Sequence, residues 1–407
     1  MTRLEITSIA AGGDGVGRTD GMVVFVPRGA AGDVAEVRLV RSKRFARGEI
    51  DSIEIASPDR VTPQCAHYTV DRCGGCQIQH LSYDAQLRAK GSIIGDALRR
   101  IGRRTVDDIV VLPSDGQWRY RRKLTLHLRR TGTRWIAGLH PYDDPSFVFD
   151  LHDCPITDER VIAIWRDMRA AFDYLPRERA LRVAVRLLED GAAVVVEGGG
   201  AWEESDRFFQ AVPSIAELWW KPEHGRMRRL AARAAEAQGG ASFVQVNAQV
   251  AARLQAHVLD RARAYAPLRV VDAYAGVGGT ALPLAASGAT VVAIEHDAEA
   301  VARFAGRLHL PSSAIVGRVE DHIAAALPAD LVILNPPRGG VDARVADALQ
   351  TVAKAPNALI YVSCDPATLS RDLARMPRYR LVAARAYDMF PQTAHVETVC
   401  ELVPEAA

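Results

Sequence analysis

The chain has 407 residues, a net charge of +2, 48% hydrophobic residues and 25% charged residues. This is the composition of a soluble globular protein with two or three domains. No apolar stretch is long enough to span a bilayer, and the first residues lack the organisation of a signal peptide. We therefore expect a cytoplasmic protein without a membrane partner. Six residues are cysteine, and because cytosolic chains rarely form disulfides, a cluster of them indicates a metal site or catalysis.

Residues 1–58 predict a small β-barrel. Short β-rich runs alternate with glycine-rich turns such as residues 11–17, a pattern typical of an OB-like barrel that binds oligonucleotides. The expected strands are Glu5–Ile9, Met22–Val26, Ala35–Arg41 and Gly48–Ile55. One stretch of this region carries five cations and no acid: Arg38, Arg41, Lys43, Arg44 and Arg47. Such a stretch suits a phosphate backbone, although a solvated strand face would have the same composition.

Three cysteines, Cys65, Cys73 and Cys76, crowd together after the barrel, and a fourth, Cys154, precedes a proline further along the chain. Four thiolates suit either zinc or an iron–sulfur cluster. The remote fourth ligand and its following proline favour iron–sulfur, whereas the spacing alone does not decide. Four free structural thiols are the remaining alternative.

Residues 59–240 are expected to form a central domain that includes this cysteine segment. Helical periodicity extends over Leu81–Ile101, and residues 118–212 are rich in strand-forming runs. Between Gln117 and Tyr142 there are seven Lys and Arg residues and no acid. Three aromatic residues are interleaved with these cations: Trp118, Tyr120 and Trp135. Aromatics among cations favour contacts with unstacked bases and phosphates.

Residues 241–407 predict a Rossmann-like α/β domain, because strands and helices alternate along them. The expected elements are strands at Arg269–Ala273, Thr290–Ile294, Leu331–Leu334 and Leu359–Val362, and a helix at Thr280–Ala286. Ligands of such a sheet bind beyond the carboxyl ends of its strands. The segments that follow these strands are therefore the candidates for the site.

Two of these segments indicate a nucleotide-like ligand. The first strand is followed by a glycine-rich loop that begins at Gly276, and Glu295 ends the second strand. Glycines let the backbone approach a ligand closely, and the acid can bind ribose hydroxyls, which suits a dinucleotide and S-adenosylmethionine equally. Asn335-Pro336-Pro337-Arg338 favours S-adenosylmethionine, because its two prolines fix a turn that can hold the Asn335 amide against a planar substrate. Alone, the motif would be an ordinary turn.

Cys364 follows the strand that ends at Val362, so its thiol is expected beyond the carboxyl end of that strand. A lone cysteine is often a small buried hydrophobe, but here it would converge with the glycine loop and the Asn-Pro-Pro turn. A thiolate can attack carbon 6 of uracil and make carbon 5 nucleophilic. A general base must then remove the proton from carbon 5, and His395 and Glu397 are the candidates.

Together, these motifs resemble those of the RNA uracil-5 methyltransferases that carry a TRAM barrel and a four-iron, four-sulfur cluster. The type that acts on large-subunit ribosomal RNA is the most similar. The resemblance extends over residues 1–400 and is carried by three segments: Cys73-Gly74-Gly75-Cys76-Gln77-x-Gln79-His80, Phe243-Val244-Gln245-Val246-Asn247 and Asp388-Met389-Phe390-Pro391-Gln392-Thr393-x-His395-Val396-Glu397. It implies methylation of carbon 5 of a uridine in RNA, with S-adenosylmethionine, through a covalent cysteine adduct.

The resemblance also implies roles for single residues. Cys364 matches the nucleophile, and Glu397 matches the base. The positions that match cofactor contacts are Gln245, Tyr274, Glu295 and Asn335, and the cluster ligands are Cys65, Cys73, Cys76 and Cys154. Asn335 stands where aspartate is commoner.

Other functions compete with this one. In an iron–sulfur oxidoreductase with NAD at the glycine loop, Cys364 and the Asn-Pro-Pro turn would have no function in hydride transfer. A non-catalytic RNA-binding protein would need neither Cys364 nor Glu397. The nearest variant is a transfer RNA methyltransferase, against which the amino-terminal barrel argues. The sequence gives no sign of an obligate protein partner.

Overall fold

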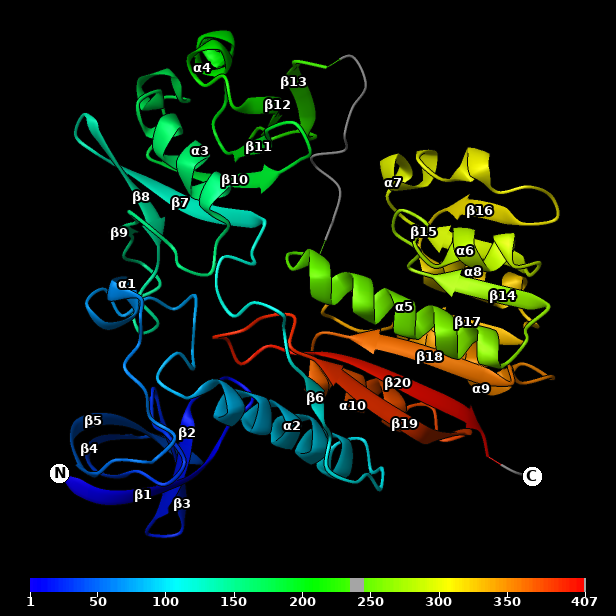
Figure 1. Ribbon diagram of the computed structural model, residues 1–407, viewed down its shortest axis with the longest axis horizontal. Coiled ribbons are helices and arrows are strands. Elements are labelled where there is room, and N and C mark those ends of the chain that lie inside the picture. Colours follow the sequence, from blue (N-terminus) through cyan, green and yellow to red (C-terminus); the bar gives the residue numbers. More distant parts are fainter. Residues whose placement is uncertain (235–244, 406–407) are drawn as a thin grey trace.

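The computed structural model describes residues 1–234 and 245–405, which form three lobes (Figure 1). A barrel at the amino terminus and a central domain lie on one side, and a larger α/β domain lies on the other. Within the described residues, no helix is both long enough and apolar enough to cross a bilayer.

The first lobe is a closed five-stranded barrel, as expected. Its strands follow the order β1-β2-β3-β5-β4, with β1 (Thr2–Ile9), β2 (Gly15–Thr19), β3 (Met22–Val26), β4 (Val34–Arg41) and β5 (Phe45–Ile55). The expectation of a turn over residues 11–17 is wrong in its second half, because Gly15 begins β2. Gly17 serves close strand packing there, since a Cβ atom on it would lie 2.6 Å from the carbonyl oxygen of Glu5.

The central lobe is built on a seven-stranded sheet with the order β13-β12-β11-β10-β7-β8-β9. Its strands are β7 (Lys123–Thr131), β8 (Arg134–Leu139), β9 (Phe149–Asp150), β10 (Ala180–Leu187), β11 (Ala192–Glu197), β12 (Ile215–Lys221) and β13 (Arg228–Ala232). Helices α3 (Glu159–Arg169) and α4 (Ser205–Ala211) contribute Trp165 and Phe208 to its core. The short helix α1 (Ala66–Thr69) lies in the cysteine segment.

The third lobe is the predicted Rossmann-like domain. Its sheet has the order β16-β15-β14-β17-β18-β20-β19-β6, with β14 (Arg269–Ala273), β15 (Thr290–Glu295), β16 (Ser313–Val316), β17 (Leu331–Leu334), β18 (Ala358–Ser363), β19 (Tyr379–Tyr387), β20 (Glu397–Pro404) and β6 (Val111–Leu112). The strands from β16 to β18 pair in parallel, whereas β20 is antiparallel to both β18 and β19. The four strands expected from the sequence are confirmed to within a residue or two.

Helices cover both faces of this sheet (Figure 1). They are α5 (Ala248–Ala264), α6 (Ala281–Ala286), α7 (Ala298–Ala302), α8 (Val319–Ala326), α9 (Ala343–Thr351) and α10 (Pro366–Ala374). One face also receives α2 (Tyr83–Arg100), whose Ile94 and Leu98 join the core beneath α8, α9 and α10. The strand β6 then pairs with β19 at the sheet edge. Segments from before the central sheet therefore complete the carboxyl-terminal domain.

Candidate active site

Cys364 lies just beyond the carboxyl end of β18, as the sequence predicts. Every residue of β18 is buried, which is typical of a central parallel strand. The strand ends at Ser363, and α10 begins two residues after Cys364, where the Asp365 carboxylate caps the helix by accepting from the Thr368 N–H at 2.7 Å. The tight turn between strand and helix leaves the Cys364 side chain half-buried at the rim of the sheet.

Glu397 begins β20, the strand beside β18, and lies close enough to Cys364 for its charge to act on the Cys364 thiol. Ser363 pairs with Thr398 in the antiparallel ladder, so the next positions along the two strands are Cys364 and Glu397. The Glu397 side chain is only 4% exposed, and this burial raises the pKa of its carboxyl to about 7. Burial also raises the pKa of the Cys364 thiol, and the Glu397 charge adds to that increase. The pair combines a thiol with a carboxyl that titrates near neutral pH, as groups at functional sites often do.

A cation joins this pair from the Asn-Pro-Pro-Arg turn after β17. Arg338 acts against burial at both groups, because its positive charge lowers the pKa of Cys364 and that of Glu397. Asn335 is exposed at the start of the same turn, and its backbone N–H donates to the Ala273 carbonyl at 3.3 Å, beside the glycine loop. Arg338 belongs to the Asn335-Pro336-Pro337-Arg338 motif, but the motif alone does not indicate this influence on Cys364 and Glu397.

The glycine loop and Glu295 form one hydrogen-bonded unit. The Gly276 N–H donates to Glu295 Oε2 at 2.9 Å, and the Asp297 N–H donates to Glu295 Oε1 at 2.8 Å. Gly278 has φ +78°, and a Cβ atom there would lie 2.5 Å from the Phe304 ring. Oε1 also lies 2.7 Å from His296 Nδ1, so Oε2 is the oxygen of Glu295 that retains acceptor capacity. These residues therefore fit a ligand with ribose hydroxyls.

Tyr274 and Gln245 lie in different surroundings. The backbone of Tyr274 has φ +65° and accommodates the turn after β14, and burial raises the pKa of its phenol beside Glu320, Asp342 and Asp372. The Tyr274 side chain packs in the core of α8 and α9. Gln245, by contrast, lines a cavity between the central and carboxyl-terminal lobes.

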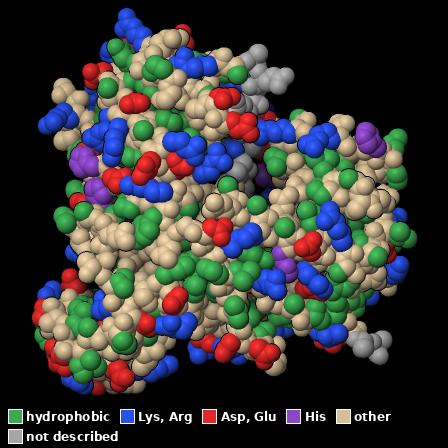
Figure 2. Space-filling model, viewed as in Figure 1, with side chains coloured by type: hydrophobic (Ala, Val, Ile, Leu, Met, Phe, Trp, Pro, Cys, Tyr) green, Lys and Arg blue, Asp and Glu red, His purple; other side chains and the backbone are tan. Residues whose placement is uncertain are grey.

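This interlobe cavity has a volume of about 400 Å³ and is rich in cations. It is lined by Arg122, Lys123, Arg186, Leu187, Leu188, Glu189, Gln245, Val246 and Ala248. Burial, and then the charges of Arg182 and Arg186, lower the pKa of Lys123, as expected for clustered like charges. In Figure 2, Lys and Arg side chains gather where the central lobe borders the hollow beside the carboxyl-terminal lobe. The cavity suits an anionic ligand.

The four predicted cluster cysteines share one region of the central lobe. Cys65 and Cys76 belong to a small buried core, against which Cys154 packs. Burial raises the pKa of Cys73 to about 12, and the charges of Cys154 and Cys65 contribute to the increase. The Gly75 N–H donates to Cys73 Sγ at 3.4 Å. Within residues 1–234 and 245–405, no group of three or more His, Cys, Asp or Glu side chains is arranged to hold a metal ion.

Two of the aromatics expected to meet bases also pack against this region. Trp118 and Tyr120 pack against the core of Cys65 and Cys76, and the Tyr120 hydroxyl donates to the Pro391 carbonyl at 3.0 Å. Trp135 packs against the main core of the central lobe. Hydrophobic patterning does not separate partly buried rings such as these from rings on which bases stack, because both kinds lie among cations in the sequence.

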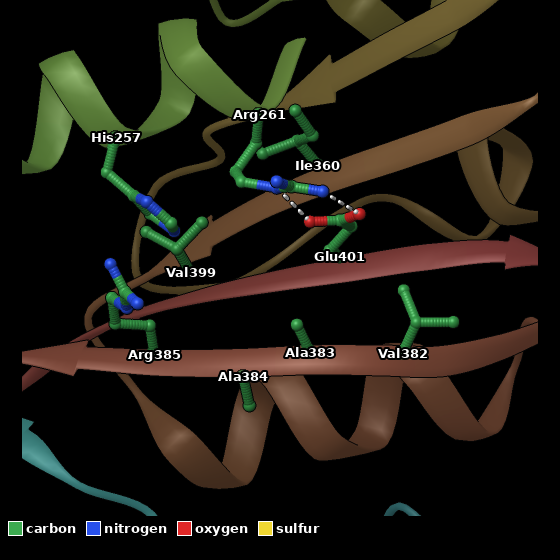
Figure 3. Close-up of a pocket in the computed structure, with 9 residues that line it drawn as sticks. All are labelled: His257, Arg261, Ile360, Val382, Ala383, Ala384, Arg385, Val399 and Glu401. Carbon is green, nitrogen blue, oxygen red and sulfur yellow. Dashed lines mark hydrogen bonds and ion pairs between the residues drawn. The ribbon is translucent and has the colours of Figure 1, made fainter. Parts of the chain in front are cut away.

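A second cavity, of about 340 Å³, lies between α5 and the strands β18, β19 and β20 (Figure 3). Arg261 lies at its edge and makes a bidentate ion pair with Glu401, with N–O distances of 2.7 and 3.0 Å. None of the residues that line it belongs to the glycine loop, the Asn-Pro-Pro turn or the Cys364–Glu397 pair. We therefore place the active site at the strand ends and not in this cavity.

Comparisons with known proteins agree with this geometry. The family described as tRNA (Uracil-5-)-methyltransferase matches residues 317–403, which include both Cys364 and Glu397. The TRAM domain matches residues 2–50, in the barrel. An uncharacterized RNA methyltransferase of Thermosynechococcus vestitus is 32% identical over 98% of this chain and 97% of its own length.

Two further proteins resemble the whole chain. A 23S rRNA (uracil(1939)-C(5))-methyltransferase of Thiobacillus denitrificans is 32% identical and covers 97% of this chain and 98% of that protein. The crystal structure of a Pyrococcus abyssi tRNA (uracil-54, C5)-methyltransferase in complex with S-adenosyl-L-homocysteine has a TM-score of 0.71 and 24% identity. That match covers 98% of this chain and 99% of the archaeal one, so the two share their fold.

Proposed function

The chain belongs to the RNA uracil-5 methyltransferase family, and from this premise we propose that Cys364 and Glu397 methylate carbon 5 of a uridine in RNA. The observation that carries the proposal is the pair itself: a thiol and a buried carboxyl meet across β18 and β20, with Arg338 beside them. S-adenosylmethionine, when bound, would supply the methyl group.

Cys364 would begin the reaction. Its thiolate forms a bond to carbon 6 of the uracil, and the electrons of the 5,6 double bond become available at carbon 5. The thiol must first lose its proton, which burial disfavours and Arg338 favours. Carbon 5 would then take the methyl group from the sulfonium of S-adenosylmethionine, whose S–CH3 bond breaks to leave S-adenosylhomocysteine, and would carry both that group and its original hydrogen.

Glu397 would complete the reaction. Its carboxylate takes the proton from carbon 5, the 5,6 double bond forms again, and the bond between carbon 6 and Cys364 breaks. A buried carboxyl with a pKa of about 7 is a stronger base than an exposed one, and it still loses its proton at neutral pH. His395 is exposed and two positions away, so we assign the base role to Glu397.

Glu295 and the glycine loop would hold the methyl donor. The loop brings the backbone at Gly276 close to the Glu295 carboxylate, leaving acceptor positions for ribose hydroxyls. We propose Gln245, Tyr274 and Asn335 as further contacts of the cofactor or the target base.

We propose ribosomal RNA as the substrate. The support is the Thiobacillus denitrificans relative, which is named for 23S rRNA and matches nearly the whole chain at 32% identity. The barrel does not decide between ribosomal and transfer RNA, because the match to the archaeal tRNA enzyme covers 98% of this chain. Cations of the barrel and of the interlobe cavity would bind the phosphates. A ribosomal substrate also fits a cytoplasmic location.

We further propose that the four cysteines hold a four-iron, four-sulfur cluster. They supply four thiols in a buried region, with a backbone N–H directed at Cys73 Sγ. Four thiolates can hold either a zinc ion or such a cluster, so the metal content of the protein decides between them. Such a cluster would brace the segment from Cys65 to Cys76. The methyl transfer moves no electrons through it.

The experiment that tests the function is transfer of labelled methyl groups from S-adenosylmethionine to total RNA from cells that lack the protein. We expect 5-methyluridine to form at one position of ribosomal RNA. A Cys364→Ala variant is the matched control. Label found only in transfer RNA would move the substrate assignment, and label at another atom would refute the reaction.

A further inference from the structure

The segment that leads into Glu397 is held from outside the catalytic sheet. Residues 388–396 join β19 to β20, which begins at Glu397. Gln86, on α2, makes two hydrogen bonds to the middle of this segment. Its Oε1 accepts from the Gln392 backbone N–H at 2.9 Å, and its Nε2 donates to Gln392 Oε1 at 2.9 Å. Gln392, which accepts and donates these hydrogen bonds, has φ +70°. A residue other than glycine adopts this backbone conformation at a cost in free energy.

Lys90, one turn further along α2, holds the start of the same segment. Its ammonium donates to Asp388 Oδ1 at 2.5 Å and to the Phe390 carbonyl at 3.0 Å. The side chains of Lys90 and Asp388 are both 0% exposed. Nothing in the reaction proposed above uses either charge.

A buried ion pair is a poor device for stability alone. Removing two charges from water costs free energy that their attraction often fails to offset, and an apolar pair of similar size can be equally stable. What a charged donor with two acceptors provides is a single geometry. Here the two acceptors belong to Asp388 and Phe390, so the fixed geometry is that of the segment before Glu397.

We propose that Lys90 is a positioning residue for the methylation: it fixes the segment 388–396 and thereby keeps the Glu397 carboxylate at carbon 5 of the uridine. The inference rests on the proposed function. Lys90 is not a catalytic residue. It acts on the position of Glu397 through Asp388 and Phe390, whose oxygens accept hydrogen bonds from its ammonium. Only the last step uses Glu397, so misplacing the segment should slow elimination and spare attack by Cys364.

The variant that tests this is Lys90→Met combined with Asp388→Leu. It removes both charges together and leaves no buried charge unpaired, so we expect a melting temperature close to that of the wild type. The methylated protein–RNA adduct should persist roughly ten- to a hundredfold longer, because a small displacement of a catalytic group has effects of that size. The affinities for RNA and S-adenosylmethionine should be unchanged. Arg88→Met is the matched control, since Arg88 is an exposed cation of α2 that pairs with Asp59.

Two results would overturn the inference: an adduct as short-lived as that of the wild type, or a double variant that melts well below it. The second would make the pair a determinant of stability instead of position. Wild type and Glu397→Gln are assayed beside it. If the wild type fails to methylate RNA, the proposed function is wrong, whereas normal wild-type behaviour with a short-lived adduct in the double variant refutes only the role of Lys90.

Discussion

Cys364 and Glu397 are the residues one position beyond the last ladder pair that joins β18 to β20, Ser363 with Thr398, and the Glu397 charge raises the pKa of the Cys364 thiol. The antiparallel insertion of β20 beside a parallel strand creates this relationship, because it brings the start of one strand to the end of the other. Opposed positions of antiparallel strands have Cβ atoms roughly 5 Å apart. In the proposed reaction, the thiol attacks carbon 6 of the pyrimidine ring and the carboxylate takes the proton from carbon 5.

Replacing the base should separate the two halves of the reaction. In Glu397→Gln we expect methyl transfer to proceed and elimination to stall, because the amide cannot take the proton from carbon 5. A methylated RNA linked to the protein should then survive denaturing gels, and release should slow by roughly a hundredfold or more. His395→Ala is the control and should release product normally. Normal release by the glutamine variant would assign the base elsewhere.

The charge of Arg338 should influence the pH below which kcat declines. Glu397 works as a base only above its pKa of about 7, so elimination in the wild type should decline as the pH falls below neutral. Arg338 lowers the pKa of both Glu397 and Cys364. In Arg338→Met both pKa values rise, and the acidic limb of the profile of kcat against pH should move to higher pH. Arg344→Met, on a neighbouring exposed cation paired with Asp321, should leave the profile in place. An unmoved limb in Arg338→Met would exclude this electrostatic role.

The cysteine region should bind iron. Protein purified without oxygen should be brown and contain about four irons per chain, as expected for four thiolate ligands. Replacing Cys65, Cys73, Cys76 or Cys154 by serine should bleach the colour and lower the melting temperature. Cys400→Ser is the control, since Cys400 is buried in the other domain. Stoichiometric zinc with no iron would refute the cluster.

The barrel should contribute to RNA affinity through two cations at the turn before β5. Lys43 and Arg44 are exposed there beside the exposed ring of Phe45, whereas Arg41 pairs with Asp20 at 2.9 Å. In the double variant Lys43→Ala/Arg44→Ala, the plot of log K against log salt should flatten by about 1.4, if two phosphates of a single strand lose their contacts. Affinity for S-adenosylmethionine should not change. Arg3→Ala, which removes a cation paired with Glu54, serves as the control. An equal salt slope in the wild type, the double variant and the control would show that this turn does not contact RNA phosphates.

The sequence predicted the elements whose signals are local. Buried parallel strands such as Arg269–Ala273 and Leu331–Leu334 read as short apolar runs, and their carboxyl ends carry the glycine loop and the Asn-Pro-Pro turn. The pair of Cys364 and Glu397 was therefore within reach of sequence reasoning. The Rossmann-like fold and the barrel were also correct.

The contacts that hold the site in place were not predictable. Lys90 and Asp388 are 298 positions apart, and an amphipathic helix does not indicate which sheet it covers. The same limit applies to β6, a two-residue strand, and to Trp118 and Tyr120, whose burial depends on a core that the chain assembles from distant segments. Arg338 was present in a recognised motif, but its influence on Cys364 and Glu397 needs their positions in space.

The most direct test of the central claim is to incubate the wild-type protein and S-adenosylmethionine with RNA that contains 5-fluorouridine. Fluorine cannot leave carbon 5 as a proton does, so elimination should fail and the adduct should become permanent. We predict one methylated RNA–protein adduct per chain, with the nucleotide mapped by mass spectrometry to Cys364, and none with Cys364→Ala. An adduct on any other residue, or turnover by Cys364→Ala, would contradict the account.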